Sequence, residues 1–306
     1  MYIKYLIYVL FRLLYRGDFM AEEILKTTAN ILTFPVAAPF DVAYKHSQTA
    51  TPVGPHSHNA VELYFTLSDL PDVLLNNTVS AVPAGTLIII PPFCVHQLYH
   101  GVGIMYERYI LSINIQWLDA VFCDKADTLS YLKRSDAPLL LTPDAAGKEE
   151  FLRLLDRLIS FSKTDTPEAM AGFFDVLSFL NEMVDRLSPE SNQSFPISST
   201  QRSTNEMISY IQNHIYENLT VTDLAKHFFL NPDYLSRLFK KHAHTSIGHY
   251  ITLQKMATAQ SLLREGYTVT QVQEKLGYSS YAYFFKTFQK NAGISPSKYR
   301  AQYFRK

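Results

Sequence analysis

The chain has 306 residues, and its 28 Lys and Arg balance 28 Asp and Glu, so its formal net charge is zero. That length predicts two domains, each large enough for a sizeable core. Two cysteines without metal or redox spacing argue against a disulfide scaffold and favour a reducing cytoplasm, and no run of eighteen apolar residues predicts a membrane span.

The first twenty residues hold a short apolar run, residues 5–14, that lacks a small-residue cleavage site and is at most a weak signal-like segment. Met20 is a better start for translation. We therefore expect residues 1–19 to be a non-native or disordered extension, and an N-terminal sensor domain to span residues 20–187.

Short β-rich runs separated by turn residues fill residues 30–115. Examples are residues 61–67, residues 72–79 with their Asn-Asn turn, and residues 86–90 ahead of two prolines. Many short strands at regular spacing predict a sandwich or a barrel. The chain has no Gly-rich phosphate loop and no Gly-x-Ser-x-Gly motif, so we expect neither an enzyme nor a bound cofactor.

Polar residues recur inside this region as His56-Ser-His58, then Glu62, and later His96. On a strand, residues two and four apart share a face, so these side chains can converge. The pattern resembles the two cupin motifs, which implies a small β-barrel lined by these four residues. One departure is Phe93, where the second motif usually has Gly.

Three interpretations of this set stay open. It can hold Zn, Fe, Mn or Ni, it can line an effector pocket without metal, or it can belong to an ordinary core. We expect no metal, with His56, His58, Glu62 and His96 as the candidates if one is present. The predicted effector pocket comprises His56, His58, Glu62, Tyr64 and His96, and Tyr44, Phe65 and Tyr99 are aromatic candidates nearby.

Residues 147–163 and 167–187 change to helical periodicity. The second segment carries an apolar seam at spacings of four and three, the pattern of helix pairing: Phe173, Leu177, Leu180, Val184 and Leu187. We expect a homodimer through helix 167–187, with packing against the barrel as the alternative. Residues 188–203 lose periodicity, gain Ser, Pro, Asn and Gln, and are predicted to be a linker.

The last hundred residues contain two helix-turn-helix patterns in series. In the first, residues 219–241, Thr222 is a candidate N-cap for a short helix, and Asn231-Pro232 begins a second helix. In the second, residues 267–290, Gly277 occupies the turn and Ser279 or Ser280 caps the next helix. Residues 246–264 predict one linker helix between the two units.

Charge separates the two halves of the molecule. From residue 204 onward, 13 Lys and Arg face 6 Asp and Glu, a net of +7, so residues 1–203 carry −7. A basic domain is the electrostatic footprint expected for binding to phosphates. Combined with two helix-turn-helix patterns, this charge predicts DNA binding.

Residues 204–306 resemble the DNA-binding domain of the AraC family of bacterial transcription regulators. The match rests on the run from Gly277 to Lys290, on the closing segment from Gly293 to Arg300, and on Tyr250, Ile251, Lys255, Met256 and Ala259 in the linker helix, where Lys255 replaces the usual Arg. The resemblance implies one recognition helix in each of two successive major grooves of double-stranded DNA.

The resemblance also assigns the DNA-binding residues by position. Base-reading positions fall on Asp233, Ser236 and Arg237 in the first unit and on Tyr281, Ala282 and Lys286 in the second, while Lys240, Lys290 and Arg300 are expected to meet phosphates. Two departures affect the second unit. Gln273 replaces a small Ala and needs a hydrogen-bond partner if buried, and Phe285 replaces a small polar residue.

The predicted fold class is therefore α+β, with an N-terminal cupin-like β-barrel carrying a helical appendage and a C-terminal all-α domain of two helix-turn-helix units joined by a linker helix. The predicted function is a cytoplasmic, effector-responsive transcription activator that contacts RNA polymerase. The alternatives are a metal-dependent cupin enzyme or metal sensor fused to a DNA-binding domain, and a sensor that works without a small effector.

Overall fold

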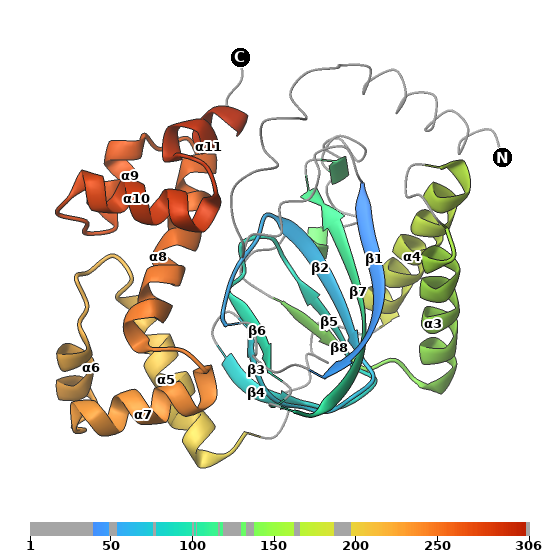
Figure 1. Ribbon diagram of the computed structural model, residues 1–306, viewed down its shortest axis with the longest axis horizontal. Coiled ribbons are helices and arrows are strands. Elements are labelled where there is room, and N and C mark those ends of the chain that lie inside the picture. The colour runs from blue at the N-terminus through green and yellow to red at the C-terminus, as the bar shows by residue number, and fades with distance from the viewer. Residues whose placement is uncertain are drawn as a thin grey trace.

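The computed structural model describes residues 39–48, 54–75, 78–99, 101, 103–115, 117–118, 130–132, 138–161, 166–186 and 197–303. Figure 1 shows antiparallel sheets in the N-terminal half, with helices α3 and α4 on one side and a group of helices from the C-terminal third on the other. The predicted α+β class with an all-α C-terminal part is confirmed. The predicted extension, residues 1–19, lies outside the described residues.

Two antiparallel sheets form the N-terminal part. The larger has the order β1-β7-β2-β5-β8 and the smaller has the order β4-β3-β6. Their strands are β1 (Phe40–Gln48), β2 (Ala60–Thr66), β3 (Leu70–Leu75), β4 (Thr78–Val82), β5 (Leu87–Ile90), β6 (His96–Tyr99), β7 (Met105–Asn114) and β8 (Leu139–Leu141). The predicted strands 61–67 and 86–90 correspond to β2 and β5.

The strand β2 is buried on both faces, and its alternation sorts the side chains. Leu63 and Phe65 point into a cluster shared with the helices α3 (Ala145–Ile159) and α4 (Pro167–Arg186). Tyr64, on the opposite face, packs with Ile88, Ile90 and residues of β3 in a second cluster between the sheets. Glu62 has the same parity as Tyr64 and therefore lies on the inter-sheet side.

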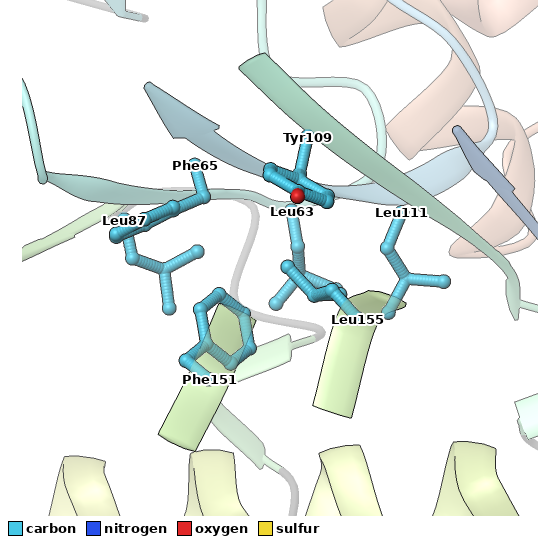
Figure 2. A pocket seen from close by; sticks show the side chains of 7 residues that line it. All are labelled: Leu63, Phe65, Leu87, Tyr109, Leu111, Phe151 and Leu155. Atoms are coloured by element: carbon cyan, nitrogen blue, oxygen red, sulfur yellow. The ribbon is translucent and has the colours of Figure 1, made fainter. Parts of the chain in front are cut away.

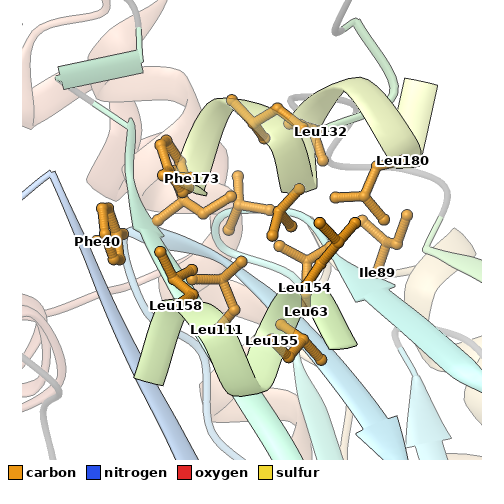
Figure 3. Packing of buried hydrophobic residues seen from close by; sticks show 14 of the residues in the cluster. Phe40, Leu63, Ile89, Leu111, Leu132, Leu154, Leu155, Leu158, Phe173 and Leu180 are labelled. Carbon is orange, nitrogen blue, oxygen red and sulfur yellow. The ribbon is translucent and has the colours of Figure 1, made fainter. Parts of the chain in front are cut away.

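The helix α4 packs its apolar seam inside the chain. Phe173, Leu177 and Leu180 are at most 3% exposed and belong to the same cluster as Phe40 and Leu63 of the sheet. Figure 3 shows Phe173 and Leu180 in this packing, together with Phe40 and Leu63. The expectation that this seam pairs two chains is wrong for these residues, because the core of the chain's own N-terminal part already covers them. Leu187 lies outside the described residues.

The helical C-terminal part begins earlier than the sequence predicts. Helix α5 (Ser199–Asn213) starts inside the expected linker, because Ser198 and Gln201 form a capping box that satisfies backbone N–H groups at its first turn. The remaining helices are α6 (Val221–His227), α7 (Pro232–Ala243), α8 (Ile247–Arg264), α9 (Val269–Lys275), α10 (Tyr281–Ala292) and α11 (Pro296–Tyr303). Among the described residues, no helix has both the length and the apolar character that crossing a membrane requires.

Candidate functional site

The first helix-turn-helix unit consists of α6 and α7. Thr220, rather than the predicted Thr222, caps α6, because its hydroxyl accepts from the N–H of Asp223 while that carboxylate accepts from the N–H of Thr220. Asn231 caps α7 and Pro232 occupies its first turn, as the sequence predicts. These two caps fix where both helices begin and thus how α7 is presented.

The predicted DNA-binding residues of α7 lie away from its core. Leu235 and Phe239 are fully buried on the inner side. On the outer side Asp233, Arg237 and Lys240 are exposed and Ser236 is partly exposed. The first unit therefore offers a polar, partly basic surface of the kind a major-groove helix needs.

The second unit consists of α9 and α10 and repeats this arrangement. Gly277 adopts φ 71° in the turn, a conformation that a residue with a Cβ adopts only with strain, and Ser280 caps α10. Phe284 and Phe288 are fully buried. The predicted DNA-binding residues of this helix are all exposed: Tyr281, Ala282, Lys286 and Lys290.

The two departures from the family pattern have different outcomes. Gln273 is half-buried and its amide donates to the backbone carbonyl of Tyr278, so the partner that a buried amide needs is present within its own turn. Phe285 is half-buried on α10, and its ring lies 6.2 Å from that of the exposed Tyr281. Phe285 therefore supports an aromatic surface on α10 next to the predicted base-reading residues.

The helix α8 joins the two units, and Lys255 holds them together. This lysine is only 7% exposed, and its Nζ donates to the carbonyl of Glu217, after α5, at 2.8 Å and to that of Leu276, at the end of α9, at 2.7 Å. Its ammonium also lies 5.3 Å from the centre of the Tyr278 ring. Burial lowers the pKa of Lys255. One buried cation thus links the segment before the first helix-turn-helix unit to the end of α9 in the second.

In the N-terminal part, the predicted histidines converge. His56 lies before β2 and forms an isolated bridge with His96 at the start of β6, through two backbone hydrogen bonds of 3.0 and 2.9 Å. One nitrogen each from His56, His58 and His96 lies within 4.8 Å of the others. His58, Glu62 and His96 are buried, while His56 is partly exposed.

Backbone carbonyls set the tautomers of two of these rings. His56 Nδ1 donates to Gly54 O and His96 Nδ1 donates to Cys94 O, both at 3.0 Å. A carbonyl only accepts, so in the neutral rings both protons sit on Nδ1 and each Nε2 carries a lone pair. Burial and the neighbouring His96 lower the pKa of His56 to about 4, which keeps this ring neutral at pH 7.

Glu62 is shared by the other two rings. Nε2 of His58 donates to Glu62 Oε2 at 3.2 Å, and Nε2 of His96 lies 3.2 Å from the same oxygen without the geometry of a hydrogen bond. Burial raises the pKa of Glu62, but favourable contacts led by the hydrogen bond from His58 outweigh burial and hold that pKa well below its usual range. Nδ1 of His58 is buried with no protein partner. The cluster therefore contains buried imidazole nitrogens, Nδ1 of His58 and Nε2 of His96, that make no hydrogen bond within the described residues.

The comparison with known proteins concerns the C-terminal part. Residues 224–302 match the family model described as a helix-turn-helix domain. The regulatory protein PocR of Salmonella typhimurium is 32% identical over 96 residues, which cover 31% of this chain and 32% of PocR. The uncharacterized HTH-type transcriptional regulator YobQ of Bacillus subtilis is 33% identical over 136 residues, covering 44% of this chain and 52% of YobQ.

Among solved structures, the C-terminal domain of AraT, a response regulator from Geobacillus stearothermophilus, is 30% identical with a TM-score of 0.34. The match covers 36% of this chain and 92% of that domain. Residues 224–302 of this chain therefore form an AraC-type helix-turn-helix domain. The shared segment spans about a third of PocR and about half of YobQ, so the resemblance lies in the helix-turn-helix domain.

The aromatic candidates for the effector pocket do not gather around one cavity. Tyr64 stacks near Tyr106 between the sheets, close to the Glu62 side of β2. Tyr44 is 44% exposed beside Tyr109, and Tyr99 stacks on His244 of the C-terminal part. The pattern of alternation predicts the face of Tyr64 but not the partners of the others.

An apolar hollow lies between the larger sheet and α3 and leaves no room for a water molecule (Figure 2). It is lined by Leu63, Phe65, Leu87, Tyr109, Leu111, Phe151 and Leu155. This hollow is therefore a packing gap, and it lies on the face of β2 opposite to Glu62.

The structure also shows a polar contact site between the two parts of the chain that the sequence does not predict. Asp72 on β3 contacts His242 at 3.2 Å and His244 at 3.3 Å, both from the end of α7, and accepts from Gln201 of α5 at 3.0 Å. The side-chain amide of Asn205 in α5 accepts from the backbone N–H of Val79 in the edge strand β4 and donates to its carbonyl. The smaller sheet thus contacts both α5 and the end of α7 in the first helix-turn-helix unit. No sequence spacing signals these pairs, because their members lie more than 120 residues apart.

Proposed function

We propose that this chain is a sequence-specific DNA-binding transcription regulator in which both helix-turn-helix units read one face of a promoter. The observation that carries the proposal is the exposure of predicted reading residues on the outer faces of α7 and α10, while apolar residues on their inner faces, such as Phe239 and Phe284, are buried. The helix α8 has 18 residues and therefore a length of roughly 27 Å. Successive major grooves on one face are about 34 Å apart, so two helices flanking α8 are suitably spaced.

Electrostatics supports the same proposal. The net charge of +7 from residue 204 onward attracts the phosphate backbone, and the exposed Lys240 and Lys290 lie on the recognition helices themselves. Such contacts fix the register of a protein on DNA without reading its sequence. Reading is then left to the neighbouring polar side chains on the same helices.

The test is selection of binding sites from random duplex DNA with the full chain. The proposal predicts enrichment of a motif with two blocks of preferred bases about one helical turn apart. Binding without any enriched motif, or no binding at moderate salt, would contradict it.

We further propose that the histidine cluster is the effector site, made by His56, His58, Glu62 and His96 with Tyr64 on the adjoining face of β2. Its support is the unusual concentration of buried polar atoms in an otherwise apolar space between the sheets. A ligand that binds two conformations unequally shifts the balance between them. The family resemblance supports an output through RNA polymerase.

A second candidate function is metal sensing, and the tautomers favour it. Imidazoles that ligate a metal usually donate their other N–H to a carbonyl or carboxylate, as His56 and His96 do. Three histidines beside a carboxylate suit a divalent transition metal such as Zn²⁺. The donor set present thus fits such an ion, although the sequence favours a polar pocket without metal.

The measurement that tests metal sensing is the metal content of the full chain, purified without chelator. Metal sensing predicts close to one equivalent of transition metal, lost in His58→Ala and retained in His46→Ala. His46 is a suitable control because it is exposed and contacts only Glu107 among the ion pairs of the described residues. Absence of metal, together with no uptake of added Zn²⁺, would leave the cluster as polar lining for an organic effector.

A further inference from the structure

The residue Phe93 lies between the histidine cluster and the second helix-turn-helix unit. It belongs to the segment that connects β5 to β6, and its backbone N–H donates to His58 O at 2.8 Å. The next residue, Cys94, supplies the carbonyl that fixes the His96 ring. Phe93 is therefore bonded to the backbone of His58 and, through the neighbouring Cys94, is linked to the ring of His96.

The side chain of Phe93 is packed into the other half of the molecule. It is 6% exposed and belongs to the cluster formed by Met256, Leu263 and the core of the second unit. The guanidinium of Arg264, at the end of α8, lies 4.1 Å from the centre of its ring. The ring of Tyr299 in α11 meets it edge-on at 6.3 Å. Both contacts are of types that stabilise aromatic packing.

Phe93 also has a strained backbone. Its φ is 64°, in the left-handed region that residues with a Cβ avoid. A glycine would adopt this turn freely, but it would leave the second unit without a ring to pack on. A strained non-glycine residue that persists at a junction is a reason to look for a function.

We propose that Phe93 couples the histidine cluster to the second helix-turn-helix unit, so that binding at the cluster changes how firmly that unit is held. This inference rests on the proposed effector site. A ligand that draws the imidazoles together moves the backbone of His58 and Cys94, and Phe93 follows because it is bonded between them. The ring then shifts against Arg264 and Tyr299. The first unit is docked separately, through Asp72 and Tyr99.

The test is hydrogen–deuterium exchange of the full chain without DNA, read in peptides covering residues 256–267 and 294–303. Phe93→Gly removes the ring and relieves the strain, and should speed exchange there by roughly tenfold, the factor expected for one aromatic and one cation–π contact. His58→Ala should speed exchange in the same peptides several-fold. The volume-conserving Glu62→Gln should have the same effect, and it serves as the test if His58→Ala does not fold. Combined with Phe93→Gly, neither should add any further effect.

Two controls separate the coupling from general loosening. Phe93→Ala also loses the ring but keeps the strained φ, so it should match Phe93→Gly in the second unit while its sheets stay less stable than those of Phe93→Gly. Tyr99→Ala should loosen the end of α7 and leave the effect of His58→Ala on the second unit intact. The proposal is overturned if His58→Ala and Glu62→Gln leave residues 256–267 unchanged, or if their effect persists without the Phe93 ring. Neither result would alter the outcome of binding-site selection, which tests DNA reading on its own.

Discussion

At the scale of single residues, Arg237 is the side chain of α7 best suited to read a base, because a guanidinium can donate two hydrogen bonds to guanine. It is exposed, one turn from the equally exposed Lys240. Arg237→Ala is expected to weaken binding to the preferred site by roughly 1–3 kcal/mol and to relax the preference at one base position. Fluorescence anisotropy on the selected site and on its single-base variants measures both quantities.

Lys240→Ala is the matched control, because a phosphate contact carries no sequence information. It should weaken binding to all sites alike and reduce the slope of log affinity against log salt by about 1. An Arg237→Ala variant that lost affinity equally for every sequence would instead place this side chain on the backbone of the DNA.

At the scale of elements, the junction between the two units depends on one buried cation. Lys255→Met removes the donor to the carbonyls of Glu217 and Leu276 and leaves both without that partner. We expect a loss of roughly 2–4 kcal/mol in the free energy of unfolding of the C-terminal domain, measured by urea denaturation. Lys255→Arg, which restores the residue usual in this family, should retain most of that stability. If Lys255→Met were as stable as the unaltered chain, the hydrogen bonds from Lys255 would contribute little to the stability of this domain.

The helices and strands were largely predictable because their signals are local. Asn231-Pro232 and Ser280 mark helix starts in the sequence and act as such in the structure. The failures involve competing local signals, since Thr220 and Thr222 both lie at the start of α6 and only the pairing of Thr220 with Asp223 decides which one is the cap. Composition misplaced the linker, because the Ser-rich stretch that reads as flexible also contains the capping box of Ser198.

Long-range partners could not be predicted in the same way. The seam of α4 has the spacing of a pairing helix, but spacing does not distinguish a second chain from the chain's own sheet, and here Phe173 and Leu180 face the sheet. The convergence of His56, His58 and Glu62 was expected from strand alternation and a resemblance, but both histidines lie before β2, so the strand geometry behind that expectation is wrong. The role of Phe93 at the junction of the two halves had no sequence signal beyond its replacing a glycine.

At the scale of the whole molecule, Asp72 holds the small sheet against the first helix-turn-helix unit. Burial raises the pKa of this carboxyl, but hydrogen bonds led by that from His244 outweigh burial and lower it below its ordinary value. The contribution of Asp72 to docking is therefore fully present above the ordinary aspartate pKa of about 4, and it is lost as pH falls through the lowered value.

Asp72→Asn should consequently speed hydrogen exchange at the end of α7 at neutral pH and flatten the acid dependence of that exchange below pH 4 or so. Val79→Ala is a useful comparison, since it removes apolar contact from the same interface without a titrating group. An acid dependence that is the same in Asp72→Asn and in the unaltered chain would assign the effect to other carboxyls.

The central claim is that two units on a rigid helix read one face of DNA, and the spacing of the site tests it most directly. Affinity for the selected site would be measured before and after insertion of 5 or 10 base pairs between its two blocks. Five base pairs turn the second block by about half a turn, and ten move it about 34 Å along the axis. Because α8 fixes the separation of α7 and α10, both insertions should lower affinity by roughly tenfold or more. Affinity that is unchanged by either insertion would mean that one unit reads the DNA alone and would contradict the account.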